Sequence, residues 1–277
     1  MSLKAVAWAL LAAAAIAGVL LLNYWAAYQP LSTLVYLGIV LAVGGLANVA
    51  IPFRFLGIRR RIAGALVLSA GFTLALAGLY WPARTIHVAQ HKTRLDDAMP
   101  EYQFNERHSA RVHAGREQLM RAVREATFGD MRSLNALLRI RGAALHAGSD
   151  NGAFASDKRI LDAFSASGYL SGGNEHEIVM IGVVDVRARR LAEVRTLEEA
   201  AAFRAKDAVK MAFDFEVEEA GAGWSRITTE TRVLALDDSG RGMAKYWRLI
   251  VPGSGLLRLQ WLDGIKRRAE SMPATGS

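Results

Sequence analysis

The chain of 277 residues contains no cysteine, and its first acidic residue is Asp96. The lack of cysteine excludes a disulfide-stabilised miniprotein, a zinc ribbon and a cysteine nucleophile. The sequence also lacks the GxxxxGK[ST] phosphate loop, the GxSxG elbow and a GxGxxG that opens a helix after a strand. P-loop NTPases, α/β-hydrolases and Rossmann dinucleotide-binding enzymes are therefore set aside. With 52% hydrophobic and 22% charged residues, the chain is not a disordered one.

Negative charge is missing only from the N-terminal part. Residues 1–82 hold five charged side chains, all of them basic: Lys4, Arg54, Arg59, Arg60 and Arg61. They account for +5 of the formal net charge of +8 and leave +3 for residues 83–277. A mixed surface of such low net charge does not favour nucleic acid as a partner.

Three apolar runs without any charged residue fill this part, at 5–22, 31–51 and 62–80. Each is close to the ~20 residues that a helix needs to cross the hydrocarbon core of a bilayer. A cleaved signal peptide would have a shorter apolar region of roughly 7–15 residues, and it would not explain the second and third runs. The sequence therefore predicts a transmembrane region of three helices over residues 1–82. Because no ionisable residue lies inside a run, the region is expected to be an anchor and not a transporter.

The positive charges predict the orientation of these helices. Lys4 and the cluster of arginines between residues 54 and 61 would lie on the same side of the membrane. The positive-inside rule then places the N-terminus in the cytoplasm and the C-terminal part outside it.

The remaining chain is expected to form a linker over 83–100, a domain over 101–271 and a disordered tail over 272–277. Strict alternation predicts a strand over 102–112, with Glu106 and His108 on its buried face. The pattern then predicts helices at 116–127 and 130–141, strands at 158–165 and 176–186, a helix at 197–203, and a hairpin with arms at 209–217 and 224–236.

In the second arm of this hairpin, the face that carries Arg226, Thr228, Glu230 and Arg232 is expected to be solvated. An amphipathic helix over 243–265 ends the domain, and Pro252 should kink or break it. A curved antiparallel sheet covered by one long helix is an α+β fold that tends to enclose a cavity.

Four segments carry a resemblance to a known superfamily. They are TTETRV (Thr228–Val233), YWRLIVPGSGLLR (Tyr246–Arg258), IKRRAE (Ile265–Glu270) and PEYQFNERH (Pro100–His108). Over about residues 100–270 the chain resembles a bacterial branch of the START-like, polyketide-cyclase and lipid-transport (SRPBCC) superfamily. The resemblance implies a helix-grip fold with a deep apolar pocket, which in relatives holds lipids, sterols, polyketides or plant hormones. It carries no catalytic residue over and covers none of the membrane part. The bacterial branch and the predicted transmembrane region together indicate an integral protein of a bacterial cytoplasmic membrane.

The leading hypothesis is a membrane-anchored module that binds or transfers a hydrophobic small molecule or lipid. Taken one residue at a time, ordinary core packing is the favoured explanation for each residue of the expected cavity face. These residues are Phe213, Phe215, Thr229, Thr231, Met243 and Trp247.

Two alternatives stay open. The first is an enzyme of the cyclase or dehydratase type, in which Glu106 and His108 act as acid and base in an apolar pocket. It fails if the strand lies at the sheet edge with both side chains solvated, or if both pair with arginines. The second is an interaction protein whose pocket is filled by its own side chains. No cofactor and no metal are expected, because His87 and His91 lack a third ligand nearby.

Overall fold

The computed structural model describes residues 16–18, 21, 29–50, 61–131, 155–188, 190–236 and 239–273. The chain forms two compact units. The first comprises residues 1–82 and 244–252, and the second comprises residues 83–243 and 253–277. Each unit is considered by itself.

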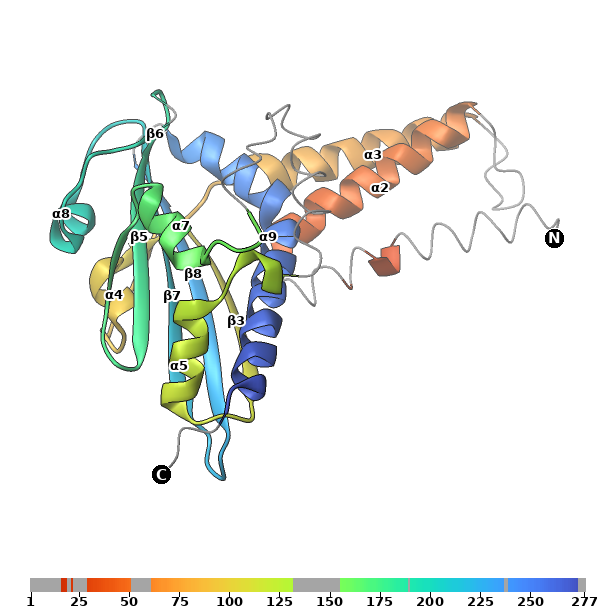
Figure 1. The fold of residues 1–277 in the computed structure, drawn as a ribbon. Helices are drawn as coiled ribbons and strands as arrows, with labels where there is room; N and C mark the ends of the chain where they lie inside the picture. Colours follow the sequence, from red (N-terminus) through yellow and green to blue (C-terminus); the bar gives the residue numbers. More distant parts are fainter. Residues whose placement is uncertain are drawn as a thin grey trace. The chain divides into compact units, whose positions relative to one another are not determined.

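Two packed helices, α2 (Pro30–Ala50) and α3 (Arg61–Tyr80), make up most of the described part of the first unit (Figure 1). Each is long and apolar enough to cross a membrane. They confirm the second and third predicted apolar helices to within a residue at each end. The first predicted helix, over 5–22, lies outside the described residues except for positions 16–18 and 21, so two such helices are described and not three.

Glycines form the contact between α2 and α3. A Cβ atom built on Gly45 would lie 2.3 Å from the backbone nitrogen of Leu68, and one on Gly71 would lie 2.4 Å from that of Ala42. Real Cβ atoms do not approach backbone so closely, because their van der Waals radii would overlap. Glycines recur every seven residues along the contact, at Gly38 and Gly45 in α2 and at Gly64, Gly71 and Gly78 in α3.

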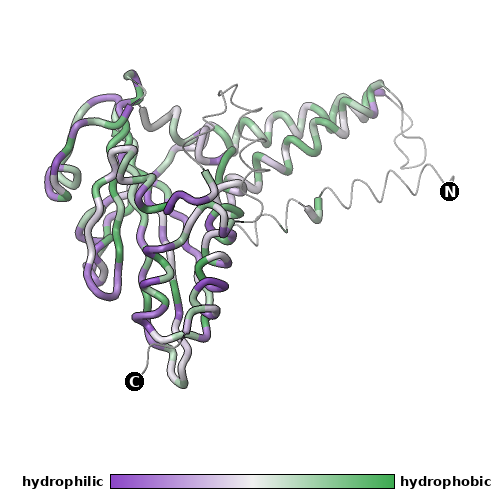
Figure 2. Tube along the Cα trace, in the orientation of Figure 1, coloured by the Kyte–Doolittle hydropathy of each residue, from purple (hydrophilic) through white to green (hydrophobic). Residues whose placement is uncertain are grey.

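The outward faces of these two helices are apolar, and their contact is made mainly by small or polar residues, with Val35 also buried there. Ile62 is 70% exposed and Val43 is 61% exposed, whereas Ser32, Thr33 and Asn48 are buried. Figure 2 shows little purple along either helix. A water-soluble hairpin would bury its large apolar side chains instead.

The N-terminal half of α9 (Ser239–Ser271) belongs to the same unit as this helix pair. The buried guanidinium of Arg248 donates to the carbonyl oxygens of Leu79 (2.7 Å) and Trp81 (2.6 Å) at the C-terminal end of α3. The last carbonyls of a helix generally lack a partner within the helix, and a cation suits the negative end of a helix dipole.

The second unit is an α+β fold built on an antiparallel sheet of six strands, with order β3-β8-β7-β5-β4 and β6 paired to β5. Its strands are β3 (Phe104–Val112), β4 (Leu170–Gly173), β5 (Glu177–Asp185), β6 (Arg190–Leu191), β7 (Ala208–Glu219) and β8 (Ser225–Ala235). A separate two-stranded sheet pairs β1 (Ile86–His87) with β2 (Glu101–Tyr102).

Helices cover both faces of the six-stranded sheet (Figure 1). On the face called inner here, the larger core includes α5 (Arg116–Glu125), the 3₁₀ turn η2 (Phe128–Asp130), α7 (Ile160–Ala166) and the C-terminal half of α9. On the outer face, a smaller core is closed by α4 (Arg94–Ala98) and α8 (Leu197–Ala202). The sheet is therefore a middle layer with a core on each side.

Several sequence predictions are confirmed and others are corrected. The strand over 102–112, the strand over 176–186, the hairpin and the helices at 116–127 and 197–203 are all present. Residues 158–165 were predicted as a strand but form α7, because Ile160 and Phe164 share one helical face against the inner core. Of the predicted kink or break at Pro252, the break is wrong, because α9 contains Pro252 within one continuous helix. Most of the predicted helix at 130–141 and of the tail at 272–277 lies outside the described residues.

The part of the outer layer that contains α4 comes from residues that the sequence predicts as a linker. Within 83–100, α4 buries Leu95, Ala98 and Met99 against the sheet. Two carboxylate oxygens of Glu177 accept the backbone N–H groups of Arg94 (2.7 Å) and Leu95 (2.9 Å) and so hold the start of α4 on β5. This cover overturns the prediction that the face with Glu230 and Arg232 is solvated, since both side chains are buried.

Candidate functional site

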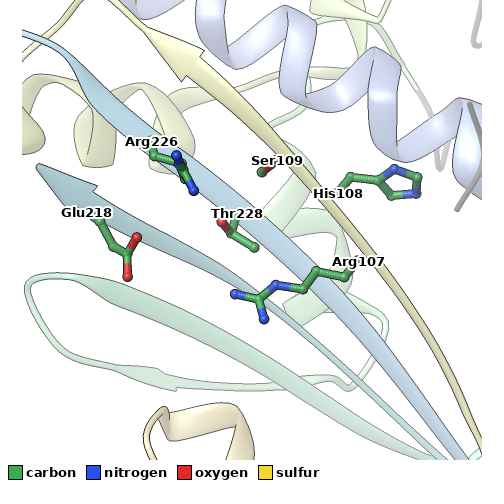
Figure 3. A pocket seen from close by; sticks show the side chains of 6 residues that line it. All are labelled: Arg107, His108, Ser109, Glu218, Arg226 and Thr228. Carbon is green, nitrogen blue, oxygen red and sulfur yellow. The ribbon is translucent and has the colours of Figure 1, made fainter. Parts of the chain in front are cut away.

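A carboxylate and an imidazole lie side by side on the inner face of β3. Glu106 is 1% exposed and His108 is 7% exposed. The Nε2 atom of His108 is 2.7 Å from Oε1 of Glu106. β3 is the edge strand of the sheet, yet both side chains are buried. Figure 3 shows the imidazole on the other side of β3 from Arg107 and Thr228, which point to the outer face.

The strand register places this pair at one end of a cross-strand row. Glu106 is directly opposite Thr231 of β8, and Thr231 is directly opposite Phe213 of β7. Side chains opposite each other in an antiparallel pair share a face and are neighbours. The row therefore leads from a carboxylate through a hydroxyl to an aromatic ring.

Arg258 and Trp261 of α9 lie over the aromatic end of this row. The guanidinium carbon of Arg258 is 4.5 Å from the ring centroid of Phe213 and 5.2 Å from that of Trp261. The Trp261 ring is in turn 4.6 Å from the ring of Phe215 and is stacked on Phe164 at 6.1 Å. A cation is thus held against aromatic faces, an arrangement that is favourable when water is excluded.

Four buried polar atoms in this region have no hydrogen-bond partner. They are Oε2 of Glu106, Oγ1 of Thr231, Nη1 of Arg258 and Nε1 of Trp261. Buried polar groups in proteins are nearly always paired, and each unpaired one costs about 1–3 kcal/mol. Their presence within one sheet-and-helix interior marks it as the candidate site, which we call the inner site.

Burial changes the proton affinities of two groups at this site. It lowers the pKa of the Arg258 guanidinium, and the carboxylate of Glu106 acts most strongly against that effect. It also raises the pKa of the Tyr169 hydroxyl to about 12. Tyr169 lies beside the aromatic side chains of the inner site, and its ring centroid is 5.1 Å from that of Phe164. Its ring has room because Gly182 carries no side chain there.

The six residues predicted to line a cavity are divided by the structure. Phe213, Phe215 and Thr231 belong to the inner site, whereas the Thr229 hydroxyl is already used as a donor to the carbonyl of Asp214 (2.7 Å). Met243 is partly exposed at the start of α9. Trp247 belongs to the first unit, where its Nε1 atom donates to Gln29 (3.3 Å).

Arg258 and Trp261 were not singled out as site residues from the sequence. A signal for Arg258 was present, because it lies three, four and seven residues before Trp261, Leu262 and Ile265. This spacing puts its cation on the apolar stripe of the helix. A charged residue within an apolar stripe is the sequence pattern that could have identified Arg258 as a candidate site residue.

Two surface hollows in the described part of the chain are lined mainly by polar and charged residues, unlike the predicted apolar cavity. One, of about 320 Å³, is lined by Arg107, His108, Ser109, Glu218, Arg226 and Thr228 (Figure 3). Another, of about 360 Å³, is bordered mainly by charged and polar side chains that include Lys92, Arg116 and Glu216. Among the residues that the structure describes, no group of three or more His, Asp or Glu side chains is placed to hold a metal ion.

A second polar cluster lies on the outer face around Asp214. The Glu230 backbone N–H donates to Oδ1 of Asp214 (2.6 Å), and the paired register of β7 and β8 is interrupted there. Burial raises the pKa of the Asp214 carboxyl well above its usual value, and the neighbouring Glu177 and Glu230 raise it further. This carboxyl is therefore held in a place that favours its neutral form.

Replacing Asp214 with asparagine tests that assignment, because the amide oxygen can still accept from Glu230. A group whose pKa is raised by folding stabilises the fold fully only below its ordinary pKa, and this contribution is lost as the pH rises through the folded-state pKa. Asp214→Asn should therefore raise the melting temperature of the full chain near pH 7, and the gain should disappear near pH 4. Glu218→Gln, on the exposed end of the same face of β7, is the control and should show no such trend. An equal shift at every pH would contradict the raised pKa.

Comparisons of the chain with models of protein families, with curated proteins and with solved structures found no match.

Proposed function

We propose that the protein is a membrane-anchored module that binds or transfers a hydrophobic small molecule or lipid at the inner site. The observation that carries the proposal is the set of four unpaired polar atoms within an aromatic interior. Ligand sites are mostly apolar and contain a few polar groups that fix the orientation of the ligand. A sheet covered by a C-terminal helix also agrees with the helix-grip fold of the START-like superfamily that the sequence resembles.

The membrane part of the proposal is supported by α2 and α3. Their large apolar side chains point outward and their small residues pack inside, as expected for helices solvated by lipid. We place the N-terminus in the bacterial cytoplasm and the sheet-bearing unit outside it, from the arginine cluster between α2 and α3. A periplasm-dependent reporter fused to the C-terminus should be active, and a well-expressed but silent fusion would reverse this orientation.

An enzyme of the cyclase or dehydratase type is the second candidate. The observation in its favour is the buried contact of 2.7 Å between His108 and Glu106. A paired imidazole and carboxylate in an apolar interior are suited to move a proton. The enzyme hypothesis requires a ligand at the same site, so a test of binding comes before a test of turnover. The third candidate, an interaction protein, is supported by the side chains of Trp261 and Phe164 that fill the interior.

Photolabelling of the full chain in lipid nanodiscs tests the binding proposal. A hexadecyl chain with a diazirine group and an alkyne handle is added to the lipid, irradiated and traced to peptides by mass spectrometry. Contact with lipid should label α2 and α3 in any case. If the inner site binds the probe, we expect additional labels on peptides that contain β3, β8 and residues 253–271 of α9. Labels confined to α2 and α3 would support the interaction protein and contradict binding.

A further inference from the structure

The polar atoms of the inner site fall into two complementary kinds. Arg258 Nη1 and Trp261 Nε1 can only donate hydrogen bonds, whereas Oε2 of an ionised Glu106 can only accept. The Thr231 hydroxyl does both, and it lies between Glu106 and the ring of Phe213 over which Arg258 is held. A molecule that satisfies them must therefore offer an acceptor and a donor together.

The formal charges of Arg258 and Glu106 have opposite signs and compensate each other. Among the neighbours of Arg258, Glu106 is the group whose charge acts most on it, and the two carry opposite signs. His108 is hydrogen-bonded to Oε1, the other carboxylate oxygen of Glu106. A negatively charged group would gain Arg258 but would bring a second negative charge near Glu106. A positively charged group would have the reverse difficulty, because an uncompensated charge is strongly disfavoured in a buried site.

We propose that the ligand of the inner site is an amphiphile whose polar end is an uncharged hydroxyl group. This inference rests on the proposed function. The hydroxyl oxygen accepts from Arg258 or Trp261, and the hydroxyl hydrogen is donated to the free oxygen of Glu106. The apolar body lies against Phe213, Phe215 and Trp261. Lipids or fatty acids that present only a charged end are rejected by the same pair of residues.

A matched series of probes tests this inference in nanodiscs that contain the full chain. Three photoreactive hexadecyl chains are compared at one mole fraction: an alcohol, a sulfonate and a trimethylammonium. The two charged ends keep their charge at every working pH. We expect the alcohol to label β3, β8 and residues 253–271 of α9 about tenfold more than either charged probe.

Removing one charge should change the preference of the site and not simply abolish labelling. Glu106→Gln keeps the size and one acceptor of the side chain but leaves Arg258 uncompensated, so the sulfonate should gain at least about tenfold relative to the alcohol. Glu218→Gln removes a carboxylate from the exposed outer face and should leave all three yields unchanged. If Glu106→Gln does not fold, Arg258→Met makes the reverse prediction, a gain for the trimethylammonium probe.

The outcomes separate the two proposals. Equal interior labelling by the three probes, or a wild-type preference for a charged end, would overturn the hydroxyl inference and leave binding intact. An alcohol preference that is unchanged in both variants would also overturn it, because neither charge would then select the ligand. No interior labelling by any probe would overturn binding itself and the inference with it.

Discussion

Gly45→Leu is expected to separate α2 from α3, whereas Gly44→Leu in the same helix should leave the pair intact. A Cβ atom at Gly45 would lie 2.3 Å from the backbone nitrogen of Leu68 and 2.8 Å from the carbonyl oxygen of Gly64. Backbone atoms cannot move aside as a flexible side chain can, so the helices must move apart. At Gly44 a Cβ atom meets nothing within 4 Å. We expect a cost of at least ~3 kcal/mol for Gly45→Leu, at the upper end for overpacking.

The absence of native cysteine makes this result easy to measure. A Cβ atom at Gly78 would lie 3.2 Å from Cβ of Leu34 and no closer than 3.0 Å to any backbone atom, so the contact is looser there than at Gly45. A small shift would bring cysteines at these two positions to the ~3.5–4.5 Å of a disulfide in the intact pair. Oxidation of Leu34→Cys/Gly78→Cys should be efficient with Gly44→Leu and largely lost with Gly45→Leu. Equal oxidation in both backgrounds would contradict the glycine contact.

The glycine contact shows what a sequence can reveal about this unit. Uncharged length alone fixes the ends of α2 and α3 to within a residue, because few sequences other than membrane spans avoid charge for so long. The seven-residue spacing of Gly64, Gly71 and Gly78 is also visible in the sequence. By itself it predicts no contact, because a glycine spacing becomes a contact only when the partner helix and its direction are known. In the structure α2 supplies Gly38 and Gly45 to complete it.

In the sheet, alternation predicts strands well and their surroundings poorly. It correctly gives β3, β7 and β8 and the buried face of β3, since a period of two follows from strand geometry. It wrongly leaves Glu230 and Arg232 in water, because their cover is α4, which is more than a hundred residues away in the chain. Likewise the strand pattern identifies Glu106 and His108 as candidates. Arg258, on which the charge of Glu106 acts, could be added only once the placement of α9 was known.

Arg232→Ala should be among the most destabilising single changes in the second unit. The Arg232 guanidinium donates to Asp96 (2.8 Å), to Glu230 (2.8 Å) and to the carbonyl of Met99 (3.1 Å), and it lies 4.8 Å from the ring of Tyr102. Removing it leaves two buried carboxylates without their cation, and breaking a buried pair in this way costs about 3–5 kcal/mol. We expect the melting temperature of the full chain to fall by about 10 °C.

Arg226→Ala is the matched control, because Arg226 is on the same strand and the same face but is exposed. Its loss should change stability by no more than about 0.5 kcal/mol. Hydrogen exchange locates the effect, since Arg232 holds α4 through Asp96 and Met99. Amides of α4 should lose protection in Arg232→Ala before those of β5 and β7 do. If both variants melt alike, the ion pairs with Asp96 and Glu230 contribute no more than a surface pair would. The outer layer would then depend on its apolar contacts, through Leu95 and Met99.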